Sequence, residues 1–195
     1  MTIALSLTLI RVLLSPIFLI LYLHHQYLGI SQVLLPFILL ALLLCAEISD
    51  LLDGMFARMR NQVTELGKIL DPMADSIFRL SVYLAFTQGV VQLPLWLVLF
   101  FFYRDSMIST LRTVCALRGV VLSARLSGKI KAVIQAAGAF FILLLMVPYV
   151  FGWISLEQFQ TISFYTLLFA VSYSLFSGVE YIVANQPYIR KALTQ

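Results

Sequence analysis

The chain has 195 residues, of which 62% are hydrophobic and only 11% are charged, and its formal net charge is +4 at pH 7. An ordinary soluble domain contains about 45–50% apolar and about 25% charged residues. A water-soluble globule of this length could not bury so much apolar surface. The composition therefore excludes a soluble or disordered protein, and a nucleic-acid binder despite the positive charge. It predicts an integral membrane protein.

Six apolar runs are long enough to cross a bilayer, which takes about 20 apolar residues in a helix. They lie at 12–29, 32–56, 69–91, 93–117, 132–152 and 159–184. The connections between them are too short for a soluble module, so we expect residues 1–195 to form one all-α membrane domain with six transmembrane helices. Residues 1–11 end on Arg11 and are expected to form a short N-terminal helix in the membrane interface.

Lys and Arg predict the orientation of these helices. The connections 57–68 and 118–131 and the C-terminal tail carry such residues, whereas 24–33, 88–94 and 152–158 carry none. Because positive charge marks the cytoplasmic side, we expect both termini and the two basic connections to face the cytoplasm.

Four aspartates lie at the cytoplasmic ends of the second and third runs: Asp50, Asp53, Asp71 and Asp75. Spacings of three and four residues put each pair on one helical face, and the two faces can meet because the helices are antiparallel neighbours. Four carboxylates in a low dielectric repel one another unless cations hold them, and hard divalent cations prefer oxygen ligands. The alternative is that the aspartates only cap helix ends and face interfacial water. Two pairs flanking one connection favour a metal site.

Small residues accompany the aspartates. Gly54 follows Asp53, Ala57 lies one turn later, and Gly67 precedes Asp71 by four residues. Small side chains let a planar ligand or another backbone approach closely. Each residue alone is compatible with tight helix packing, but together with the aspartates they favour a nucleotide pocket beside a metal site.

From Asp50 to Asp75 the sequence fits the pattern D-x2-D-G-x2-A-R-x8-G-x3-D-x3-D throughout. This pattern resembles that of the CDP-alcohol phosphatidyltransferases. The resemblance implies six transmembrane helices after an interfacial helix, two divalent cations (Mg²⁺ or Mn²⁺) and a homodimer. It also implies an enzyme that joins a CDP-linked lipid to an alcohol through a phosphodiester and releases CMP.

The resemblance also implies a role for each fixed position of the pattern. The two cations would be bound by the four aspartates Asp50, Asp53, Asp71 and Asp75. The proton of the incoming hydroxyl would pass to Asp75 or to a metal-bound hydroxide, and the sequence leaves both open. The cytidine would be bordered by Gly54, Ala57 and Gly67, with Arg58 at the nucleotide or its phosphates.

The acceptor alcohol must be recognised outside this pattern. Arg104 and Arg112 are eight residues apart, about 80° around a helix axis, so both can face one cleft. Arginine suits a phosphate because it binds two oxygens at once. Arg104-Asp105, Leu111-Arg112 and Gly128-Lys129-Ile130-Lys131 resemble the phosphatidylglycerophosphate synthase branch of the family. That resemblance implies CDP-diacylglycerol as donor, and glycerol 3-phosphate bound through Arg104, Arg112 and Lys129.

Two positions depart from this branch, where most members have lysine in place of Ser76 and asparagine in place of Leu5. Arg79 either compensates for the missing lysine or pairs with a carboxylate. We expect Arg125 and Lys131 to be topology or lipid-headgroup charges. The alternatives are another acceptor (inositol phosphate, serine or choline) and, from a different class, a divalent-cation transporter. The expected location is a bacterial inner membrane, with the active site facing the cytoplasm.

Overall fold

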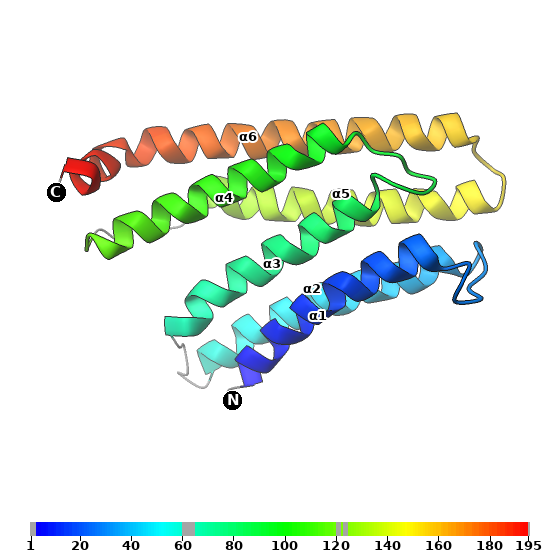
Figure 1. Cartoon of the computed structure of the whole chain (residues 1–195), viewed down its shortest axis with the longest axis horizontal. Helices are drawn as coiled ribbons and strands as arrows, with labels where there is room; N and C mark the ends of the chain where they lie inside the picture. The colour runs from blue at the N-terminus through cyan, green and yellow to red at the C-terminus, as the bar shows by residue number, and fades with distance from the viewer. Residues whose placement is uncertain (1–2, 60–64, 120–121, 123–124, 195) are drawn as a thin grey trace.

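The computed structural model describes the backbone of residues 3–59, 65–119, 122 and 125–194. Side chains are described for the same residues except 3–8, 50–59, 65–72 and 191–194. The described residues form six helices and no strand (Figure 1). These helices are α1 (Ile3–His24), α2 (Leu35–Met59), α3 (Glu65–Ala85), α4 (Leu95–Leu117), α5 (Leu126–Val150) and α6 (Leu156–Thr194).

The helices pack as two groups of three. In one group α1 packs against α2 and α3, and in the other α6 packs against α4 and α5. Contacts of α2 with α5, and of α3 with α4 and α5, join the two groups. Figure 1 shows α3 between the α1–α2 pair and the α4–α6 pair. Helix α3 therefore carries side chains toward both groups.

The two ends of the bundle differ in charge. Both chain termini, the end of α2, the start of α3, the end of α4 and the start of α5 lie at the same end in Figure 1. We call it the basic end, because Arg118, Arg125 and Arg190 belong to it. The connections between α1 and α2, α3 and α4, and α5 and α6 lie at the opposite end. This arrangement agrees with the alternation that the positive charges predicted.

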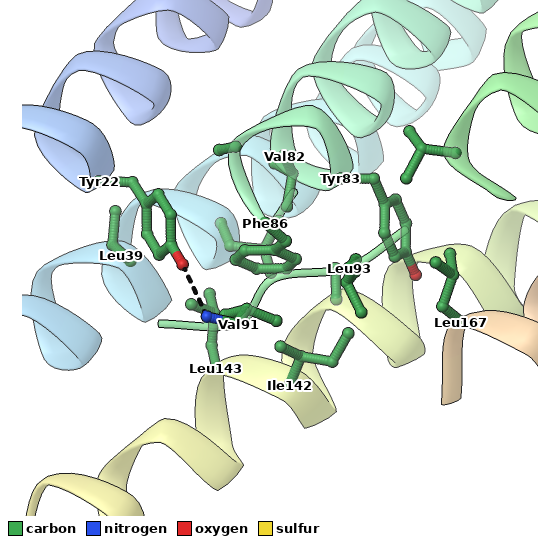
Figure 2. Close-up of a cluster of buried hydrophobic side chains, with 14 of the residues drawn as sticks. Tyr22, Leu39, Val82, Tyr83, Phe86, Val91, Leu93, Ile142, Leu143 and Leu167 are labelled. Atoms are coloured by element: carbon green, nitrogen blue, oxygen red, sulfur yellow. Dashed lines mark hydrogen bonds between the residues drawn. The ribbon is translucent and has the colours of Figure 1, made fainter. Parts of the chain in front are cut away.

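An aromatic core closes the opposite end (Figure 2). Phe86, directly after the end of α3, lies edge-on to Tyr22 of α1, with ring centres 5.7 Å apart. The hydroxyl of Tyr22 donates to the backbone oxygen of Gln88 at 3.0 Å and accepts from the backbone nitrogen of Val91 at 3.4 Å. Gly89 turns the chain here with a φ of +65°, and a Cβ on it would lie 3.0 Å from the Tyr22 hydroxyl oxygen. The buried rings thus fix the connection between α3 and α4.

Each predicted apolar run overlaps one helix, and the largest differences in extent are at the start of α1 and at the end of α6. Helix α1 is continuous from Ile3 to His24, so the expected break between an interfacial helix at residues 1–11 and a first span is wrong. The prediction rested on Arg11, but Arg11 is 2% exposed and pairs with a carboxylate inside the bundle, so it marks no helix boundary. Helix α6 has 39 residues and continues ten residues past the predicted end at 184.

Among the residues that the structure describes, two helices are long and apolar enough to cross a membrane. They are Leu126–Val150 and Leu156–Arg190. Shorter apolar stretches occupy Leu9–His24 and Leu35–Ser49. Helix α4 is long enough to cross a membrane but less apolar, because Arg104, Asp105 and Arg112 interrupt its apolar sequence. Large apolar side chains on the outside of the bundle are exposed, as suits helices in contact with lipid.

Candidate active site

The predicted metal ligands lie on α2 and α3, toward the basic end of the bundle. Asp50 and Asp53 are in the last turns of α2, and Asp71 and Asp75 are in the first turns of α3. The side chains of Asp50, Asp53 and Asp71 lie outside the described residues. The same holds for the predicted nucleotide positions Gly54, Ala57, Arg58 and Gly67. Among the side chains that are described, no group of three or more His, Cys, Asp or Glu residues could hold a metal ion.

Asp75 is the predicted ligand whose surroundings are described. Its Oδ1 accepts a hydrogen bond from Nη1 of Arg11 on α1, and its Oδ2 lies 3.2 Å from Nη2 of Arg79, one turn along α3. The same residues, together with Ala46, Glu47 and Phe78, line a small cavity between α1, α2 and α3. Arg79 therefore pairs with a carboxylate, which was one of its two expected roles.

A second cluster of charges surrounds Asp105 on α4. Nζ of Lys131 on α5 donates to both of its carboxylate oxygens, at 2.6 and 2.8 Å, and Nη1 of Arg104 donates to Oδ1 at 3.0 Å. The hydroxyl of Ser76 on α3 donates to Oδ2 at 3.4 Å. The side chains of Arg104 and Lys131 are 9% and 8% exposed. A burial this deep is costly for a charge without a partner. The Lys131–Asp105 ion pair meets this need and links α5 to α4.

The expected role of Lys131 as a topology or headgroup charge is wrong, because its side chain is buried and paired. A signal for this was present in the sequence. Lys131, Gln135, Ala139 and Ile142 follow one another at spacings of three and four residues, and all four are buried on one face of α5. Lys129 lies two residues earlier and is exposed, so the fold does not bring it into this cluster.

Arg104 also reaches α6. Its Nη2 donates to the hydroxyl of Ser177 at 2.9 Å. Its Cγ is so close to Gly178 that a Cβ added to this glycine would lie 3.1 Å from it. A side chain at position 178 would therefore press on the stem of Arg104, which packs on the backbone of α6. Arg104 and Lys131 together bring two buried cations to one described carboxylate. This excess of positive charge favours an anion nearby.

Arg112 lies two turns beyond Arg104 on α4 and also contacts α6. Its Nε donates to the hydroxyl of Tyr181 at 3.0 Å, and its guanidinium carbon is 5.0 Å from the centre of that ring. Arg104 and Arg112 therefore both contact α6, and that they face one cleft stays a prediction. The sequence did not indicate Ser177 or Tyr181 as their partners.

Glu180 of α6 binds the start of α5. Its Oε2 accepts from the hydroxyl of Ser127, and its Oε1 is 2.7 Å from Nε of Arg125. The sequence left Glu180 without a partner and treated Arg125 as a topology charge. The structure pairs the two and thereby fixes the first turn of α5, which carries Lys129 and Lys131.

Helix α3 joins the two charged clusters through neighbouring residues. Asp75 turns toward Arg11 on α1, whereas Ser76 turns toward Asp105 on α4. The predicted metal side and the predicted acceptor side therefore meet at one turn of α3. Ser76 was noted in the sequence only as a departure from a related pattern, and its contact with Asp105 could be found only from the packing of α3 against α4.

The sequence is similar to those of known proteins. The sequence profile of the CDP-alcohol phosphatidyltransferase family matches residues 1–176. A CDP-diacylglycerol–glycerol-3-phosphate 3-phosphatidyltransferase of Bacillus subtilis is 32% identical over 190 residues, covering 92% of this chain and 93% of the relative.

Two further relatives match about half of the chain. A cardiolipin synthase (CMP-forming) of Streptomyces coelicolor is 39% identical over 93 residues, which are 48% of this chain and 41% of the relative. An Aquifex aeolicus protein with the same name as the Bacillus subtilis relative is 44% identical over 81 residues, or 42% and 40% of the two chains. With its eight fixed positions from Asp50 to Asp75 and a profile match over most of its length, this chain belongs to the CDP-alcohol phosphatidyltransferase family.

Proposed function

We propose that this protein transfers the phosphatidyl group of CDP-diacylglycerol to glycerol 3-phosphate, forming phosphatidylglycerophosphate and releasing CMP. The observation that carries the proposal is the similarity to the Bacillus subtilis 3-phosphatidyltransferase, which extends over nearly the whole of both chains. Family membership leaves the alternative of a divalent-cation transporter without support.

In this reaction a hydroxyl of glycerol 3-phosphate attacks the phosphorus that carries the diacylglycerol. A new P–O bond forms, the bond to the CMP oxygen breaks, and the hydroxyl proton leaves. We assign Asp75 as the general base that takes this proton. Arg11 and Arg79 support the assignment because they hold the Asp75 carboxylate in place from two helices.

We propose that Asp50, Asp53, Asp71 and Asp75 bind two divalent cations, Mg²⁺ or Mn²⁺. The family generally depends on such cations. The donors fit, because all four are carboxylates and Asp75 lines a small cavity together with Glu47. When bound, the cations would neutralise the pyrophosphate and stabilise the departing CMP.

The two substrates would bind on either side of these aspartates. We assign the donor nucleotide to Gly54, Ala57, Arg58 and Gly67. We assign the acceptor phosphate to Arg104, Arg112 and Lys129. The assignment of the arginines is supported by the two buried cations that share Asp105 as their carboxylate among the described side chains. It is also supported by the contacts of Arg104 and Arg112 with α6.

We further propose that residues 1–195 form a single domain that crosses a bacterial inner membrane six times and assembles as a homodimer. The family is membrane-associated. The active site would face the cytoplasm, because the aspartates and the basic connections lie at the same end of the bundle.

A second acceptor deserves a direct comparison, because the Streptomyces coelicolor relative is named as a cardiolipin synthase. Formation of cardiolipin with release of CMP requires phosphatidylglycerol in place of glycerol 3-phosphate. This relative matches less than half of either chain, so we favour glycerol 3-phosphate.

The test is release of CMP from CDP-diacylglycerol by the purified protein in detergent with Mg²⁺. Glycerol 3-phosphate, phosphatidylglycerol, inositol phosphate, serine and choline are compared as acceptors, and the lipid product is identified by mass spectrometry. We expect turnover with glycerol 3-phosphate and phosphatidylglycerophosphate as product. Preference for any other acceptor would overturn the proposed substrate, and Asp75→Asn serves as the inactive control.

A further inference from the structure

The inner face of α6 is polar near the basic end. Ser174, Ser177, Tyr181 and Asn185 are buried there at spacings of three and four residues. The part of the chain that matches the family profile ends at residue 176, so Ser177, Tyr181 and Asn185 follow it. Buried polar groups are costly without partners, and two of these four find theirs on another helix: Ser177 accepts from Arg104 and Tyr181 accepts from Arg112. Asn185 instead donates to the backbone oxygen of Tyr181 on its own helix. Helix α4 lies alongside α6 and carries Arg104 and Arg112 (Figure 1).

Tyr181 contacts Arg112 through both its hydroxyl and its ring. The hydrogen bond from Nε to the phenolic oxygen is 3.0 Å long, and the guanidinium carbon is 5.0 Å from the ring centre. Tyr181 is 2% exposed, whereas Arg112 is half-buried. The packing of α6 therefore fixes the tyrosine, and the tyrosine restricts the position of the guanidinium.

This contact uses one of the three guanidinium nitrogens. Nε is bound to Tyr181, and no acceptor in the part of the chain that the structure describes binds Nη1 or Nη2 of Arg112. A guanidinium binds phosphate with two parallel N–H groups of its rigid fork. The contact with Tyr181 thus orders the side chain and leaves both terminal nitrogens available to an anion.

We infer that Tyr181 is a positioning residue, which holds the guanidinium of Arg112 so that both Nη groups can bind the phosphate of the acceptor. The inference rests on the proposed function, in which the acceptor is glycerol 3-phosphate and Arg112 belongs to its site. Because the side chain is ordered before the acceptor arrives, less freedom is lost on binding. Tyr181 therefore acts mainly on the KM for the acceptor.

The variant that tests this inference is Tyr181→Phe, which removes the hydroxyl and keeps the ring and its packing. We expect the KM for glycerol 3-phosphate to rise about threefold to tenfold, the effect of losing one hydrogen bond. We expect kcat and the KM for CDP-diacylglycerol to change less than about twofold. The matched control is Tyr173→Phe on the same helix, because the ring of Tyr173 contacts Phe176. It should change none of these values.

A double-mutant cycle separates positioning from packing. If Tyr181 acts through Arg112, adding Tyr181→Phe to Arg112→Ala should raise the acceptor KM by less than about twofold beyond Arg112→Ala alone. An equal effect in both backgrounds would overturn the inference. So would an unchanged acceptor KM in Tyr181→Phe, whether or not its unfolding temperature falls. Failure of the wild type to use glycerol 3-phosphate would instead overturn the proposed function, and this inference with it.

Discussion

Removing the charge of Asp105 tests whether the buried cluster between α3, α4 and α5 stabilises the fold. The carboxylate accepts from Lys131 at 2.6 and 2.8 Å and from Arg104 at 3.0 Å. Asp105→Asn keeps the size of the side chain but leaves the two cations without this carboxylate. The side chains of Arg104 and Lys131 are 9% and 8% exposed, so water screens the remaining repulsion weakly.

Removal of one partner from a buried ion pair costs about 3–5 kcal/mol. For a domain of about 150–250 residues, each kcal/mol lowers the Tm by about 2–4 °C. Asp105→Asn should therefore lower the Tm by about 6–20 °C.

Thermal unfolding of the purified protein in detergent, followed by circular dichroism, measures this change. The control is Glu157→Gln, because Glu157 is exposed in the first turn of α6, and it should leave the Tm unchanged. Asp105→Asn combined with Lys131→Met should recover at least about half of the loss, since the second substitution removes an unpaired buried cation. A decrease below about 2 °C for Asp105→Asn, or a double variant no more stable than the single one, would refute the reasoning.

Three further substitutions test other parts of the site. Gly178→Ala should cost about 1–3 kcal/mol by overpacking, because its Cβ would lie 3.1 Å from Cγ of Arg104. A Cβ added at Gly128 would have no atom within 4 Å, so Gly128→Ala should raise the stability by up to about 1 kcal/mol. Equal Tm changes for Gly178→Ala and Gly128→Ala would contradict the argument. Arg112→Ala should raise the KM for glycerol 3-phosphate about tenfold to a hundredfold, while titration shows unchanged affinity for CDP-diacylglycerol; the reverse pattern would move Arg112 to the donor site. Asp71→Asn should abolish turnover in a folded, membrane-inserted protein, and substantial activity at saturating Mg²⁺ would count against the metal site.

Helix α6 links the residues that we assign to the acceptor. Ser177 binds Arg104, Tyr181 binds Arg112, and Glu180 binds the first turn of α5. These three residues follow the end of the family profile at residue 176. If the assignment is right, residues of α6 outside the aspartate pattern position the arginines that bind the acceptor.

The helices and the family could be predicted from the amino-acid sequence. Apolar runs of bilayer length predicted six helices, because helix formation and hydropathy are local properties of the chain. The alternation of basic and uncharged connections predicted which helix ends lie together, as the bundle confirms. The pattern from Asp50 to Asp75 identified the family, because its fixed positions are read directly from the sequence.

The pairing of the buried charges could not be predicted from the sequence and follows from how the helices pack. Arg11 meets Asp75 across 64 positions of the chain, Lys131 meets Asp105, and Arg112 meets Tyr181. Such pairs depend on how each helix is rotated and shifted along its neighbours. Apolar periodicity does not specify that rotation here, because side chains facing lipid are as apolar as those facing the core. The partners of the buried charges could therefore be found only once the helices were packed.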